Sequence, residues 1–209
     1  MMSLLGPFVH LSPAVPAVAT FGILCFLTVD TLGLQGKAGT LVIDWFNQFS
    51  SAHRARIIRH EAGHFLAAHL LEIPVTGYTL SAWEAFRQGQ PGLGGVSFAS
   101  QELEKAAQQG KLSAQLFDRY CTVLMAGIAA ESLVYDTPEG GEDDRQAFRL
   151  LWRQTQRSIA EGEQKEKWAL FQAKSLLQNH WNAYEALVMA MEQRISVEDC
   201  AKAIEGLKE

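Results

Sequence analysis

The segment Arg59–Phe65 reads RHEAGHF and places two histidines, His60 and His64, four residues apart. Side chains at this spacing lie on one face of an α-helix, a single turn from each other. The two residues before His64 are alanine and glycine, which are small enough to let another part of the chain approach this turn closely. The sequence therefore predicts a helix whose two imidazoles are directed at one point.

The flanking residues predict where that helix begins and ends. Ser50 and Ser51 can act as an N-cap, residues 52–72 form the helix, and Pro74 closes it. Val75–Ser81 is rich in β-branched and aromatic residues and predicts a strand, and Val96–Phe98 predicts a short second strand after the loop Gln88–Gly95. The remaining predicted elements are helices over 101–109, 113–135, 143–160, 164–180, 181–194 and 196–207. The predicted fold class is mostly α, with a small β hairpin or sheet beside the histidine-bearing helix.

The chain before this helix has a different composition. The first 29 residues contain no charged side chain, and Ala14–Val29 is almost wholly apolar. This run is shorter than the ~20 residues that a membrane-spanning helix prefers, and no basic segment precedes it as in a secretory signal. Spanning, surface-docked and buried positions therefore all stay open. With Gly33–Gly39 as a turn or linker, we expect a hydrophobic N-terminal segment over 1–50 and a folded domain over 51–209.

Composition limits the kinds of partner and the cellular compartment that we expect for this protein. The formal net charge of −5 argues against a nucleic-acid-binding protein, which normally has an excess of lysine and arginine. The three cysteines are widely spaced and form no paired motif, which favours a reducing compartment. We therefore expect an intracellular protein, either soluble or associated with a membrane.

The residue types in the helix indicate metal chemistry. Two imidazoles can bind a zinc ion, and Glu61, next to His60, can take a proton from a water molecule at an open metal position. The alternative is a polar helix face on which both histidines are satisfied by ordinary hydrogen bonds. A zinc site also needs a third ligand. Asp143 and Asp144 follow a Gly-Gly turn at the start of a predicted helix, where on spacing alone capping of that helix is the favoured role.

Several of these segments in order resemble a known family. The HEAGH motif, the two-strand element, the segment Met125–Glu131 (MAGIAAE) and the Gly-rich turn leading to aspartate are similar to the peptidase domain of the FtsH family of membrane-bound AAA+ zinc proteases. The similarity runs from about Ser51 to the C-terminus, roughly three quarters of the chain.

The resemblance implies roles for individual residues. It implies that His60 and His64 bind zinc, that Glu61 is the general base, and that an aspartate at the start of a helix is the third ligand. The alignment favours Asp144, with Asp143 as the alternative.

Two further elements acquire roles in the same way. Glu131 would hydrogen-bond a ligating histidine, unless it forms a surface ion pair instead. The strand Gly95-Val96-Ser97-Phe98 would align an extended substrate, unless it is only the hairpin partner of 75–81.

The chain also departs from that family. No P-loop of the form GxxxxGK[ST] occurs in the 209 residues, Ile128 stands where the family has arginine, and the segments Glu84–Gly95 and Glu161–Lys167 do not match. The similarity is closer to the stand-alone relatives that occur in photosynthetic organisms. A thylakoid or plasma membrane is then the candidate location.

The resulting expectation is a zinc-dependent metalloendopeptidase that acts on unfolded or delivered protein substrates without an ATPase of its own. The alternative is a non-proteolytic assembly module that pairs with FtsH-type ATPase subunits or with further copies of itself, with zinc in a structural role.

Overall fold

The computed structural model describes residues 50–87, 95–99, 113–135 and 137–206, together with a few helical positions between Val18 and Thr28. By its internal contacts the chain divides into Met1–Phe49 and Ser50–Glu209. No helix in the described part of the chain combines the length and hydropathy needed to cross a bilayer. The turn expected over 33–39, most of the loop over 88–95 and the helix expected over 101–109 lie outside the described residues.

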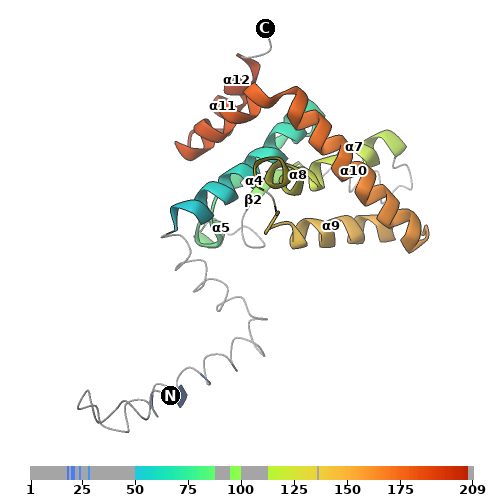
Figure 1. Cartoon of the computed structure of the whole chain (residues 1–209), viewed down its shortest axis with the longest axis horizontal. Coiled ribbons are helices and arrows are strands. Elements are labelled where there is room, and N and C mark those ends of the chain that lie inside the picture. Colours follow the sequence, from blue (N-terminus) through green and yellow to red (C-terminus); the bar gives the residue numbers. More distant parts are fainter. Residues whose placement is uncertain are drawn as a thin grey trace. The chain divides into compact units, whose positions relative to one another are not determined.

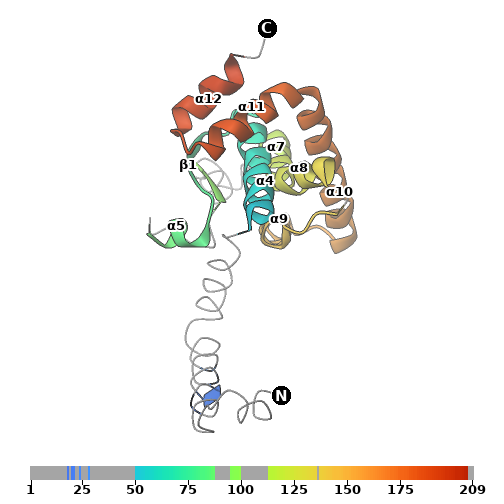
Figure 2. The ribbon, with the colours of Figure 1, turned by 60° about the vertical axis from the view of Figure 1, so that its left-hand side comes forward.

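Helix α4 (Ser51–Leu70) carries the histidine motif and passes through the middle of the folded unit, as Figures 1 and 2 show. The side chain of Ser50 caps it by accepting the backbone N–H of His53 at 3.3 Å. The second half of the helix is almost completely buried, because α8 and α11 pack along it. The predicted helix is therefore present, and it ends two residues earlier than predicted.

A two-stranded antiparallel sheet lies beside α4. It consists of β1 (Val75–Thr79) and β2 (Gly95–Phe98), with Tyr78 opposite Val96. The prediction that the first strand continues to Ser81 was wrong. Ser81 Oγ accepts the N–H of Glu84, and the Glu84 carboxylate accepts the N–H of Leu80, so the backbone turns here into the short helix α5 (Ala82–Arg87).

The helix predicted over 113–135 is two helices, α7 (Ala114–Leu124) and α8 (Ala126–Val134). The break falls at Met125, inside an apolar run that contains no local signal for it. Met125 is 1 % exposed. Both helices pack against α4 and α10, but α8 packs most extensively against α4, whereas α7 also packs against α9. Tertiary packing therefore decides the change of direction.

The C-terminal helices pack against α4, α7, α8, the sheet and one another. The helix predicted over 143–160 ends early, because Ser158 and Glu161 form a capping box that starts the next helix ahead of the predicted position 164. The segment Glu161–Lys167 is therefore part of a regular helix. The elements are α9 (Glu142–Arg153), α10 (Ile159–Asn179), α11 (Trp181–Glu192) and α12 (Val197–Glu205). The described chain is mostly helical with one small antiparallel sheet, as the sequence predicted.

Gly63 sets the distance between α4 and α8. A Cβ atom at this position would lie 2.5 Å from the carbonyl oxygen of Ala126 and 2.7 Å from the Cβ of Ala130. Both contacts are far shorter than van der Waals distance, so only glycine allows the two helices to cross this closely. The close approach expected around the motif is therefore present.

We expect Gly63→Ala to destabilise the protein. Alanine in a helix interior gains ~0.5–1 kcal/mol over glycine, but overpacking a tight contact costs ~1–3 kcal/mol, and the second effect should dominate. Urea unfolding should show a net loss of about 1 kcal/mol. Gly206→Ala is the matched control, since its Cβ would meet nothing closer than 3.5 Å. Equal midpoints for the two variants would contradict the packing argument.

Candidate metal centre

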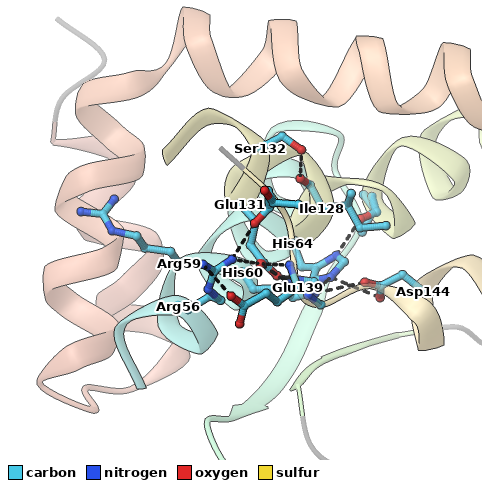
Figure 3. Close-up of polar contacts among 12 residues, drawn as sticks. Arg56, Arg59, His60, His64, Ile128, Glu131, Ser132, Glu139 and Asp144 are labelled. Atoms are coloured by element: carbon cyan, nitrogen blue, oxygen red, sulfur yellow. Dashed lines mark hydrogen bonds and ion pairs between the residues drawn. The ribbon is translucent and has the colours of Figure 1, made fainter. Parts of the chain in front are cut away.

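The two histidines of α4 face each other at one point (Figure 3). Their Nε2 atoms are 3.0 Å apart. The Nδ1 atom of His64 is 2.8 Å from the backbone carbonyl of Val123, which can only accept a hydrogen bond, so this nitrogen carries the proton. The Nδ1 atom of His60 is 2.7 Å from a carboxylate oxygen of Glu131. In their neutral forms both rings therefore turn the lone pair of Nε2 toward the same place.

A carboxylate from a distant part of the chain completes this group. Asp144, in the first turn of α9, places Oδ2 3.0 Å from His60 Nε2 and Oδ1 3.3 Å from His64 Nε2. One ligand atom from each of the three side chains lies within 4.8 Å of the others. Asp143 is exposed on the same turn and is not part of the group. The capping role that spacing alone favoured is absent, because the N-cap residue is Gly141 and no side chain caps the helix.

The residues present fit a zinc-like ion. Two imidazole nitrogens and one carboxylate oxygen are donors that zinc prefers. The space beside them is kept open by Gly127 of α8, where an added Cβ would collide with the Nε2 atoms of both histidines. The donors thus converge on a place that no side chain fills. His60, His64 and Asp144 could therefore hold a metal ion.

Glu61 lies against the small sheet. One oxygen of its carboxylate accepts the backbone N–H of Val96 at 3.0 Å, and a Cβ at Gly95 would lie 3.2 Å from the same oxygen. Burial raises the pKa of Glu61, while the charges of His64 and His60 act in the opposite direction. Ser97 and Phe98 continue the strand and pair with β1, so β2 is the hairpin partner of β1 as well as the neighbour of Glu61.

Glu131 is fully buried and is not a surface ion pair. Besides the bond to His60, its carboxylate accepts the backbone N–H groups of Glu139 at 2.9 Å and Gly140 at 3.2 Å, and one N–H of Arg56 at 3.0 Å. Burial alone would raise its pKa, but these hydrogen bonds outweigh burial and lower the pKa to about 2. The carboxylate is therefore charged, and it is satisfied on every side.

The candidate ligands are strongly coupled in charge. Burial disfavours the charged form of His60, but its hydrogen bonds to Asp144 and Glu131 outweigh that cost and raise its pKa to about 10. Burial opposes ionisation of Asp144 as well, yet the two histidines hold its pKa well below the usual range. With no metal bound, His60 is therefore protonated at neutral pH and hydrogen-bonded to acidic partners on both sides.

Two residues that shape this site were missed in the sequence. Gly127 sits in an apolar run where nothing marks it as adjacent to the histidines. Arg56 could have been found, because it precedes His60 by four residues and so shares its face of the helix.

Comparison with known proteins does not identify the chain. No protein-family model matches it, and no match to a curated protein was found. The relation to the FtsH peptidase domain therefore stays a prediction from the quoted motifs.

Asp144→Asn and Asp143→Asn form a matched pair that tests the third ligand. We expect Asp144→Asn to weaken zinc binding by more than the roughly 10–100-fold that loss of an outer hydrogen-bond partner costs, because the anionic donor itself disappears. Asp143→Asn should bind zinc like the wild type. Competition against a chelator of known affinity measures both. A loss confined to Asp143→Asn would assign the ligand to the other aspartate.

Zinc affinity should rise with pH. Zinc binds the neutral imidazole, whereas His60 with a pKa of about 10 carries a proton across the neutral range. Each proton displaced raises the apparent affinity by about tenfold per pH unit, and the rise should level off near the pKa of His60. Titration calorimetry in two buffers of different ionisation enthalpy counts the released protons at pH 7. Heats that do not depend on the buffer would contradict this charge state.

Proposed function

We propose that this chain is a zinc-dependent metalloendopeptidase that hydrolyses peptide bonds in unfolded or delivered protein substrates without hydrolysing ATP itself. One observation carries the proposal: His60, His64 and Asp144 converge from two helices that are far apart in the sequence. Glu61 adjoins His60 in α4, and the charges of all three side chains act on its pKa. The motif resemblance to the FtsH peptidase domain supports the same chemistry. The absence of a P-loop motif from the 209 residues supports action without ATP.

The candidate metal ligands and Glu61 have separate roles in the proposed reaction. A zinc ion held by the three side chains would polarise a peptide carbonyl and lower the pKa of a water molecule. Glu61 accepts the proton of the attacking water and passes it to the leaving amine. Its raised pKa suits this role, because a stronger conjugate base takes up a proton more readily near neutral pH.

The surrounding hydrogen bonds support the candidate ligands. The Val123 carbonyl and the Glu131 carboxylate each engage an Nδ1 atom, which orients the two rings and reserves both Nε2 atoms for an ion. Gly127 keeps the intervening space free of side chains. Neither histidine would have to change its hydrogen-bond partner at Nδ1 when an ion binds.

Strand β2 offers a place for an extended peptide. Among the described residues it pairs only with β1, and its Val96 N–H is directed to Glu61, so this edge of the strand faces the base. An added strand binds such an edge through main-chain hydrogen bonds, which tolerate many side chains. Substrates that are already unfolded fit this mode, since an extended backbone must be available.

The decisive experiment is cleavage of an unfolded, casein-like protein without ATP by zinc-loaded wild type and Glu61→Gln. We expect the wild type to cleave and Glu61→Gln to be slower by about 10²–10⁴-fold, the usual contribution of a general base. Zinc content should be the same in both. Glu72→Gln, at an exposed position just beyond the same helix, is the control and should retain full activity.

The other outcomes are equally informative. If neither protein cleaves although zinc is bound, the chain is better described as an assembly module, and addition of an FtsH-type ATPase subunit becomes the next test. Equal cleavage by wild type and Glu61→Gln would exclude Glu61 as the base.

A further inference from the structure

Arg56 is an arginine of α4 whose side chain is turned inward toward the candidate metal centre (Figure 3). It lies one helical turn before His60, and its side chain is 19 % exposed. One Nη atom donates to the Glu131 carboxylate at 3.0 Å and to the carbonyl of Thr137 at 2.9 Å. The other Nη is 3.2 Å from the Glu139 carboxylate.

The guanidinium also lies over an aromatic ring. Its central carbon is 4.1 Å from the ring centroid of Tyr135, the residue that directly follows α8. Arg56 therefore contacts the connection between α8 and α9 at Tyr135, Thr137 and Glu139. A planar fork with several fixed donors is suited to such a task, because each contact constrains the directions of the others.

That connection carries one of the candidate ligands. The N–H groups of Glu139 and Gly140 bind Glu131, and Gly141 then turns the chain with a φ of 98°, immediately before α9. Asp144 is in the first turn of α9, so its carboxylate is placed by how this connection lies on α4 and α8. Arg56 and Glu131 together hold the connection between α8 and α9 in this position.

Arg56 and Glu131 also contact a second candidate ligand, His60, directly or through each other. Glu131 accepts from Arg56 with one oxygen and from the Nδ1 of His60 with the other. Arg56 is thus linked to His60 through Glu131 and to Asp144 through the connection. His64 is held separately, by the carbonyl of Val123.

We propose that Arg56 is a positioning residue that sets the metal affinity of the site by holding His60 and Asp144 in register before an ion binds. The inference rests on the proposed metal centre but not on peptidase activity. Preorganised donors lose less conformational freedom on binding, so they bind more tightly.

Two effects of Arg56 on zinc affinity would have opposite signs. A positive charge close to a cation weakens its binding by Coulomb repulsion, whereas a positioning role requires that loss of Arg56 lowers the affinity.

The test measures zinc affinity by chelator competition on the full chain carrying Arg56→Met. Methionine keeps much of the aliphatic stem and removes the fork. We expect a loss of roughly 10–100-fold, the usual cost of removing an outer partner of a metal ligand. Arg56→Lys restores the charge without the fork and should recover only part of this loss.

Arg59→Met is the matched control. Arg59 is on the same helix and has similar exposure, and it makes a two-point ion pair with Glu185 of α11 at 2.8 and 3.2 Å. Removing it breaks an equivalent arginine pair away from the site. Its zinc affinity should equal that of the wild type. The absorption spectrum of the cobalt-loaded protein at saturation should change in Arg56→Met and stay unchanged in Arg59→Met.

Three results would overturn the inference: unchanged or tighter zinc binding by Arg56→Met, wild-type affinity in Arg56→Lys, or an equal loss in Arg59→Met. Far-ultraviolet circular dichroism checks folding, and if Arg56→Met does not fold, Arg56→Lys against Arg59→Met decides. Failure of the proposed function looks different. A wild type that binds zinc but cleaves nothing refutes the peptidase and leaves the Arg56 measurement valid, whereas a wild type that binds no zinc removes both.

Discussion

The site depends on the hydrogen bonds that the buried carboxylate of Glu131 accepts. A charged group with so little exposure would cost several kcal/mol if it were left unpaired. It is stabilised instead by an imidazole N–H and a guanidinium from α4 and by two backbone N–H groups from the connection to α9. These donors come from segments far apart in the sequence, so satisfying one buried charge brings those segments to fixed positions.

Close packing provides the second constraint. Gly63 lets α8 lie directly against α4, and Gly127 then comes to rest beside the histidine nitrogens, where any side chain would collide with them. Gly141 adopts a left-handed conformation that a glycine reaches without strain, and it brings α9 and Asp144 to the same place. Small residues therefore create the space, and the buried carboxylate determines which groups surround it.

The charges of the site are balanced in a way that suits a cation. Without an ion, the His60 imidazolium lies between two carboxylates, with its Nε2 proton directed at Asp144 and its Nδ1 proton at Glu131, and its positive charge offsets part of their negative charge. A divalent ion would displace the Nε2 proton, so a positive charge would stay beside Asp144. Glu61 is hydrogen-bonded to Val96 of β2 and is not among the three side chains that could hold an ion. In the proposed function, this carboxylate serves as the hydrolytic base.

Local chemistry in the sequence was sufficient for the helix of the HEAGH motif, because Ser50 caps it and the spacing of His60 and His64 is itself helical. Local spacing favoured a capping role for Asp143 and Asp144, and only the resemblance to the FtsH family indicated a ligand there, with Asp144 preferred. Consecutive residues on a helix point about 100° apart, so the packing of α9 decides that Asp144 joins the two histidines and Asp143 is exposed. The break at Met125 and the role of Arg56 were likewise decided by tertiary structure. A helix break inside an apolar run depends on which neighbours each half packs against. An arginine's partners depend on where a distant loop lies. Neither quantity is contained in a local pattern of residues.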